Sequence, residues 1–329
     1  MAADSPSPDT QLPPTTLTSR TQTQVSPTFL FYVPSFDLAV VGIVVFTGLA
    51  ALHTVLSIRT RTVYLTLLPK AAMMMAAGMV LRLILSTNTA QTVVFIVMSI
   101  LLSVPGSFLG MSLMMTYTRL VWWITPRQHR DTATLWLPPA FHTVCLCGAQ
   151  MVGDSLILLG SGLAIRPAPA HLATVGALVD MLVWGVFSAL VIRFMFISRR
   201  GRWVMERRVR DRSMELGMAL SVASVLLSIR GVMQVLEKDA MIWQINHPSG
   251  IHDQTSPPSI VSTDEWPTYV FDFLPDALIL ILMVVYFPGI YLPRPLLGFW
   301  TASDRLRREG SRETAMLGGE SDETSAGAT

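Results

Sequence analysis

Seven runs of apolar residues, each long enough to cross a bilayer, constrain this chain more than any other feature of its sequence. A helix needs about 20 apolar residues to span the hydrocarbon core. Inside that core, only helices and closed barrels satisfy the backbone N–H and C=O groups. The runs lie at residues 34–57, 64–86, 93–116, 137–159, 172–194, 213–237 and 267–290. We therefore predict an all-α, polytopic membrane protein, a bundle of seven transmembrane helices.

The composition excludes an ordinary water-soluble domain. Only 14% of the 329 residues are charged and 51% are hydrophobic, whereas a soluble domain carries about 25% charged residues. The two cysteines, Cys145 and Cys147, lie two positions apart in an apolar run and point to different helix faces. This placement excludes a disulfide scaffold and a zinc site built from cysteines.

The distribution of Lys and Arg predicts the orientation. Every alternate loop is basic, and the N-terminal tail carries only Arg20. By the positive-inside rule, the N-terminus lies outside and the C-terminus in the cytosol. We predict a disordered extracellular tail over 1–30, a transmembrane domain over 31–293 and a disordered cytosolic tail over 294–329. The basic stretch 199–212 either contacts anionic lipids of the inner leaflet or only fixes the topology. The plasma membrane is the expected location.

Ionisable side chains within the spans lie mainly in the halves nearer the outside. Such residues are costly in hydrocarbon and usually face the bundle interior or a watery cavity. The seven that form this layer are Asp37, Arg82, Asp154, Asp180, Arg230, Asp272 and Asp276. Five carboxylates and two guanidinium groups cannot all pair, so some carboxyl groups must be protonated, solvated or facing a cation. We expect the layer to form one wet, mildly acidic chamber.

The last two spans each carry a polar stripe at helical spacing. The stripe in span 213–237 consists of Arg230, Gln234 and Glu237. The stripe at the start of span 267–290 consists of Glu265, Tyr269, Asp272 and Asp276. Their matched depth and opposite charge predict that the two helices pack together, with Arg230 paired to Asp272. This pair either holds the helices in register or lines a polar pocket open to the outer leaflet.

Several chemistries are disfavoured by what the sequence lacks. There is no HExxH, GxGxxG, Walker-type or GxSxG motif, so we expect neither an enzyme nor a cofactor. His53 and His142 lie near the inner side on widely separated helices, which disfavours haem ligation. A G-protein-coupled receptor is disfavoured because Arg119 lacks the acidic residue before it. We expect no nucleic-acid partner.

The polar stripes are also where a family resemblance lies. The segments that carry it are Ile229-Arg230-Gly-Val-Met-Gln-Val-Leu-Glu237, Glu265-Trp-Pro-Thr-Tyr269-Val-Phe-Asp272 and Phe287-Pro-Gly289. The chain resembles, over about 32–295, the RTA-like family of fungal membrane proteins. That family is named for resistance to an aminocholesterol and is described as lipid-translocating exporters. Gln234 departs from the family pattern, which has a second arginine at this position.

The resemblance implies a translocator of lipid-like amphiphiles that contributes to stress resistance. The substrate would be a sphingoid base, a sterol derivative or a hydrophobic toxin, and the partners would be membrane lipids or such molecules. We expect the substrate-binding residues to be Asp272, Asp276, Arg230, Glu237, Asp180, Asp154, Tyr269 and Arg82. The carboxylates would hold the head group, and Arg230 would neutralise Asp272 in the empty site. The alternative is a seven-helix sensor that signals through its basic inner loop and tail.

Overall fold

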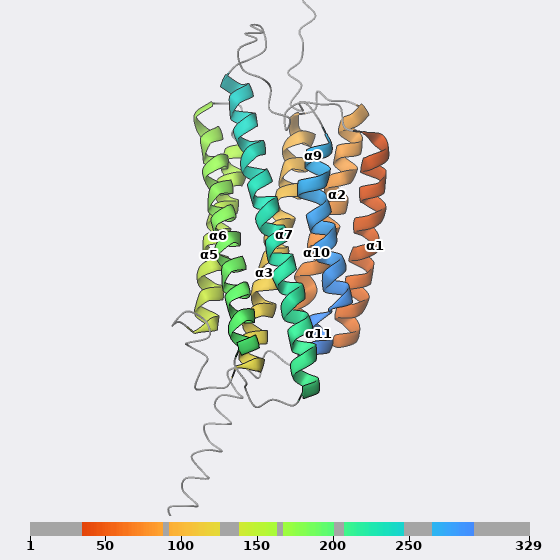
Figure 1. The fold of residues 1–329 in the computed structure, drawn as a ribbon. Coiled ribbons are helices and arrows are strands. Elements are labelled where there is room, and N and C mark those ends of the chain that lie inside the picture. The colour runs from red at the N-terminus through yellow and green to blue at the C-terminus, as the bar shows by residue number, and fades with distance from the viewer. Residues whose placement is uncertain are drawn as a thin grey trace, which may run out of the picture.

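The protein forms one bundle of long helices that run side by side (Figure 1). The computed structural model describes residues 35–87, 92–125, 138–162, 167–200, 207–246 and 265–292. Within these residues, seven helices are long and apolar enough to cross a membrane. The predicted class of fold is therefore confirmed. The predicted tails, 1–30 and 294–329, and the middle of the basic stretch lie outside the described residues.

The helices follow the predicted spans in order. The first six are formed by α1 (Phe36–Thr60), the short 3₁₀ helix η1 (Val63–Thr66) with α2 (Leu67–Thr87), α3 (Thr92–Ile124), α5 (Pro139–Gly162), α6 (Pro167–Arg200) and α7 (Arg207–Asn246). The seventh consists of α9 (Trp266–Thr268), the π-helix η3 (Tyr269–Phe273), α10 (Leu274–Val285) and α11 (Pro288–Tyr291).

Three helices extend by more than a turn beyond the predicted ends. Helix α3 reaches Ile124 instead of residue 116, and α6 and α7 are longer at both ends. The apolar pattern marks only the part of a helix that the hydrocarbon core covers. In α7 the more polar turns beyond it keep their helical hydrogen bonds without contributing to that pattern. In α3, residues 120–124 are apolar, so the prediction ended that span too early.

Helix α3 connects the two halves of the bundle. Helices α1, α2 and α3 pack in sequence, as do α5, α6 and α7, while α10 contacts both α7 and α1. Helix α3 in addition contacts α5, α7 and α10. A side chain that points inward from α3 therefore meets residues from both halves.

The bundle has an apolar exterior, as expected of a protein surrounded by lipid. Large hydrophobic side chains are exposed on every transmembrane helix. Inside, His53 of α1 is fully buried, with its Nε2 3.0 Å from the carbonyl oxygen of Leu280 in α10. This contact is one of the few polar links between α1 and the last span.

Small residues allow α5 and α6 to approach closely, as is common between membrane helices. A Cβ atom placed on Gly176 of α6 would lie 2.5 Å from the carbonyl oxygen of Gly153 and 2.8 Å from the backbone nitrogen of Ile157, both in α5. One turn away, Gly160 of α5 faces Ala173 of α6 in the same manner. These positions set the distance between the two helices.

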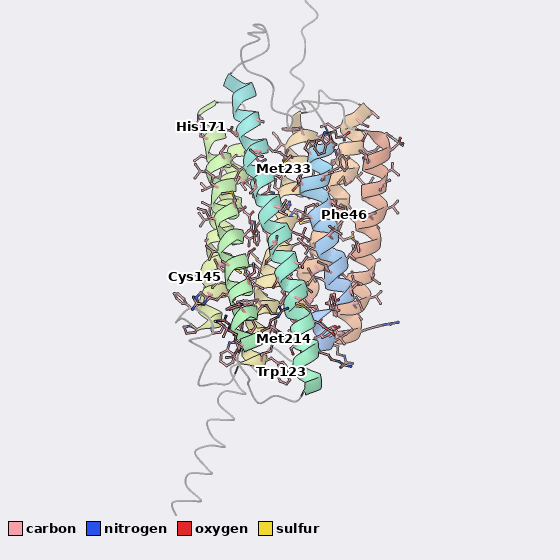
Figure 2. The ribbon with its side chains drawn as sticks, viewed as in Figure 1. Phe46, Trp123, Cys145, His171, Met214 and Met233 are labelled. Carbon is pink, nitrogen blue, oxygen red and sulfur yellow. The ribbon has the colours of Figure 1, made fainter. Side chains whose placement is uncertain are left out.

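Because the number of spans is odd, the bundle begins and ends at opposite faces. We call the end at which α1 begins the N-terminal face. Figure 2 places His171 and Met233 toward this face, whereas Cys145, Met214 and Trp123 lie toward the opposite one. Arg230 precedes Met233 by three residues in α7 and therefore lies in the same half of the bundle.

Replacing Gly176 with alanine should destabilise the bundle. The added methyl group has no space between α5 and α6, and overpacking of this kind costs about 1–3 kcal/mol. Gly185, in the same helix, has no atom within 4 Å of an added Cβ. The Gly185→Ala control should unfold at or above the wild-type temperature, since alanine favours the helix. Thermal unfolding in detergent compares the two variants, and equal unfolding temperatures would contradict the proposed crossing.

Candidate functional site

The centre of the polar interior is the buried guanidinium group of Arg230, which points from α7 toward α3 and the last span. Its Nε–H donates to Oδ1 of Asp272 at 2.7 Å, and Nε lies 3.3 Å from Oδ2 of Asp276. Its Nη2 donates to the backbone carbonyl oxygen of Leu102 at 2.9 Å. Arg230, Asp272 and Asp276 are 3%, 5% and 0% exposed. We call these three residues the central cluster.

Helix α3 leaves room for this guanidinium because it has no side chain at Gly106. A Cβ atom at Gly106 would overlap Nη1 of Arg230. The preceding residue, Pro105, has no N–H, so the carbonyl that lacks its helical donor is that of Leu101. The acceptor that Arg230 uses, the carbonyl of Leu102, lies in the turn just before this proline. A glycine and a carbonyl of α3 thus complete the site.

A second group of polar residues lies at the N-terminal face, and we call it the outer cluster. Arg82 of α2 is 2% exposed, and its Nη2 donates to Oε1 of Glu265 at 3.1 Å. The backbone N–H of Ser35 also meets the Glu265 carboxylate, at 3.1 and 2.9 Å from its two oxygens. The guanidinium carbon of Arg82 lies 4.9 Å from the ring centre of Tyr269. Glu265 therefore joins α2, the start of α1 and the last span.

The π-helix η3 separates the residues of the predicted stripe in the last span. The N–H of Leu274 donates to the carbonyl of Tyr269, five residues earlier, and Pro275, which lacks an N–H, follows immediately. The wider turn shifts the register between the residues before and after it. Glu265, the residue just before α9, contacts α1 and α2, whereas Asp272, within η3, contacts α7. The predicted stripe thus contacts α1 and α2 through Glu265 and α7 through Asp272.

Glu237 makes a third connection between α7 and the last span. The hydroxyl group of Thr268, in α9, donates to Oε1 of Glu237 at 3.0 Å. Glu237 lies two turns beyond Arg230 in α7, nearer the N-terminal face. The predicted packing of these two helices is thus present, with separate contacts at two depths.

Asp154 of α5 and Asp180 of α6 face each other where these two helices pack together. We call them the carboxyl pair. Their side chains are within hydrogen-bonding distance of each other, and Asp154 also bonds to Ser107 of α3. Arg230 acts electrostatically on both carboxyl groups. Ser107 follows Gly106 directly, so α3 touches both the carboxyl pair and the central cluster.

The chemistry of this interior is that of charge and hydrogen bonding. One guanidinium group faces four carboxyl groups, two of the central cluster and two of the carboxyl pair. Both oxygens of Asp276 lack a hydrogen-bond partner, as does Oδ1 of Asp180. Among the described residues, no group of three or more His, Cys, Asp or Glu side chains is placed to hold a metal ion.

A comparison with protein families identifies the chain's relatives. A family described as RTA1-like protein matches residues 70–295, more than half of the chain. The chain belongs to the RTA1-like family. No curated protein and no solved structure matches it. The matched range begins in α2 and contains the central cluster and the carboxyl pair, whereas α1 precedes it. With seven apolar helices, this RTA1-like protein is an integral, multi-pass membrane protein.

The structure of this RTA1-like protein places seven of the eight predicted site residues in three groups, and the eighth, Glu237, contacts Thr268. The predicted pair of Arg230 and Asp272 is present. Asp276 joins it, and Arg82 and Tyr269 belong to the outer cluster. The one ionisable residue of the predicted layer that faces outward is Asp37, which is exposed in the first turn of α1. Its place near the helix start, not at depth, explains the difference.

Several polar contacts of the RTA1-like protein were not predicted. They involve Gly106, the carbonyl of Leu102, Ser107, Thr268 and the backbone N–H of Ser35. The Pro105-Gly106 pair within an apolar span is a signal from which such a site could have been predicted. Backbone groups and small residues have no charge pattern, so the polar stripes could not reveal them.

Replacing Arg230 with methionine should destabilise the RTA1-like protein by about 3–5 kcal/mol, because it leaves the carboxylates of Asp272 and Asp276 buried without their cation. The matched control is Arg59→Met, since Arg59 is exposed at the end of α1. Thermal unfolding of the purified variants measures the effect. If both variants unfold at the wild-type temperature, the central cluster does not stabilise the fold.

Proposed function

We propose that this protein translocates lipid-like amphiphiles across the membrane or exports them from it. The substrate is a sphingoid base, a sterol derivative or a hydrophobic toxin. The polar head group binds at the central cluster while the apolar tail stays in lipid. No chemical conversion of the amphiphile is part of this proposal. The observation that carries it is a buried, charged cluster with carboxylate oxygens that accept no hydrogen bond, inside a bundle that is apolar outside.

The contrast between interior and exterior supports this role. An amphiphile crossing a membrane needs a polar path for its head group and an apolar boundary for its tail. The outward faces of the helices are apolar, whereas charged residues from α2, α5, α6, α7 and the last span point inward. Intramembrane ionisable residues of this kind commonly mark the path of a substrate or an ion.

The head group would bind through Asp276. Its carboxylate is fully buried and is 3.3 Å from Nε of Arg230, yet neither oxygen has a hydrogen-bond partner. A buried polar group without a partner is costly. A cationic or hydroxylated head group would supply the missing donors, and Arg230 would neutralise Asp272 while the site is empty. Glu237, Arg82 and Tyr269 lie between this position and the N-terminal face.

The same proposal includes the orientation. The positive-inside rule places the N-terminal face on the outside, so the outer cluster would lie at the exoplasmic end of the path, most simply at the plasma membrane. Because the sequence has no Walker-type motif, uphill movement would use a gradient or a partner protein.

Exchange of Asp272 for asparagine should reduce lipid flux roughly tenfold or more, since a hydrogen bond to a charged group contributes about 1.5–3 kcal/mol. The assay uses purified protein in liposomes with an NBD-labelled sphingoid base, and dithionite in the outer solution reports which leaflet holds the label. Asp37→Asn is the matched control, because Asp37 is exposed at the start of α1.

The outcomes of this assay separate the alternatives. Wild-type protein and the Asp37→Asn control should both transfer the label faster than protein-free liposomes. A sensor would transfer no label by itself, and this result would contradict the proposal. If Asp272→Asn is instead lost from the membrane during expression, the ion pair has a structural role only.

A second test leaves every charged residue in place. Gly106→Ala introduces a methyl group where Nη1 of Arg230 lies, so it should displace the guanidinium and reduce flux of the labelled base. Gly48→Ala, in α1, has no atom within 4 Å of the new Cβ and should transfer label at the wild-type rate. Equal rates for the two variants would show that the position of Arg230 is unimportant for flux.

A further inference from the structure

The carboxyl groups of Asp154 and Asp180 meet because α5 and α6 cross at glycine residues. A Cβ atom on Gly153 would overlap Oδ1 of Asp180, so the absence of a side chain there lets Asp180 reach α5. Gly176, one turn before Asp180, packs against the backbone of Gly153. This contact between two acidic residues is thus built into the close α5–α6 crossing described above.

The pair is buried and incompletely hydrogen-bonded. Asp180 is 3% exposed, and its Oδ1 has no hydrogen-bond partner. Gln150 lies one turn before Asp154 on the same face of α5, is 0% exposed, and has no partner for either of its amide atoms. One carboxyl group of the pair and the neighbouring Gln150 therefore have unused hydrogen-bonding capacity, which points to an exchangeable small ligand.

The charges around the pair leave it without a cation of its own. Helix α3 contributes only the hydroxyl group of Ser107, and helix α7 contributes Arg230. Arg230 is already held by Asp272 and Asp276 of the last span. Two carboxyl groups can hydrogen-bond to each other only when a proton lies between them, and such groups take up and lose protons as a unit. The ligand that this geometry fits is a proton.

We propose that Asp154 and Asp180 form a proton-binding site that drives amphiphile movement, with Arg230 as the counter-ion shared with the central cluster. This inference rests on the proposed function. With one shared proton the pair carries a single negative charge, and Arg230 stays with Asp272. Release of that proton to water gives the pair two negative charges, which attract the guanidinium group.

The guanidinium group of Arg230 would move only a short way between the central cluster and the carboxyl pair. Nη1 of Arg230 lies against Gly106, and the next residue, Ser107, bonds to Asp154. Movement of the guanidinium toward Ser107 would free Asp272 and Asp276 to hold a cationic or hydroxylated head group. When the pair binds a proton again, Arg230 returns and the head group is released. One proton leaves and one returns for each amphiphile that is moved.

Infrared difference spectroscopy of the full-length protein in liposomes tests the proton site without any transported ligand. The difference between the spectra recorded at acidic and at alkaline pH should contain the C=O band of a protonated carboxyl group. Asp180→Asn should remove this band, because Asp154 then has no carboxyl partner with which to share a proton. Asp37→Asn should retain it. If Asp180→Asn retains the wild-type band, the proposal is wrong.

A glycine variant keeps both carboxyl groups. It tests the shared-proton geometry independently if Asp180→Asn fails to fold. Gly153→Ala should push Asp180 away from Asp154 and shift or remove the band. Gly148→Ala lies on the same helix with no atom within 4 Å of its new Cβ, and it should give the wild-type spectrum. A band unchanged in a folded Gly153→Ala protein would overturn the shared-proton geometry.

Coupling is measured with the NBD-labelled sphingoid base under an imposed pH gradient, after subtraction of protein-free liposomes under the same gradient. The wild-type rate should change several-fold with the gradient, whereas the Asp180→Asn rate should be the same with and without it. A wild-type rate that ignores the gradient would refute coupling. Absence of any wild-type flux would instead contradict the proposed function, while the infrared band decides the proton site independently.

Discussion

Burying a guanidinium group inside a membrane bundle is costly unless its N–H groups meet acceptors, and in this protein that requirement determines how three segments pack. Arg230 of α7 finds carboxylates on the last span and a backbone carbonyl on α3. The acceptors come from elements far apart in the sequence, since Asp272 is 42 residues from Arg230 and Leu102 is 128 residues from it. The position of α7 thus depends on both neighbours at once, and Gly106 supplies the space.

The remaining polar groups extend this arrangement toward the N-terminal face. Glu265 accepts hydrogen bonds from Arg82 and from the backbone of Ser35, which ties α1 and α2 to the last span. Glu265, just before the last span begins, and Asp272, within the π-helix, contact different neighbours. π-Bulges are frequent at functional sites, and here one divides a structural contact from the proposed head-group site.

Helix α3 contacts both the central cluster and the carboxyl pair, and so connects the proposed head-group site with the proposed proton site. Within six residues it presents the carbonyl of Leu102, the open position at Gly106 and the hydroxyl group of Ser107. The first two hold Arg230, and the third contacts Asp154. A single cation shared by two acidic groups cannot satisfy both fully, so the charge on one group alters the other. This shared cation offers a physical route by which energy input would reach the proposed head-group site.

The sequence alone determined that the chain forms seven membrane helices and that Arg230 pairs with Asp272. Both follow from local information, since apolar length sets a span and helical spacing with opposite charge sets a matching face. Only the tertiary structure decided that Asp276 shares this cation, that Glu265 serves α1 and α2, that Asp154 meets Asp180, and that Asp37 faces outward. These outcomes depend on how the helices are rotated and how closely they cross. Glycines, a proline and backbone carbonyls control that geometry, and none of them leaves a periodic pattern of charge or hydropathy.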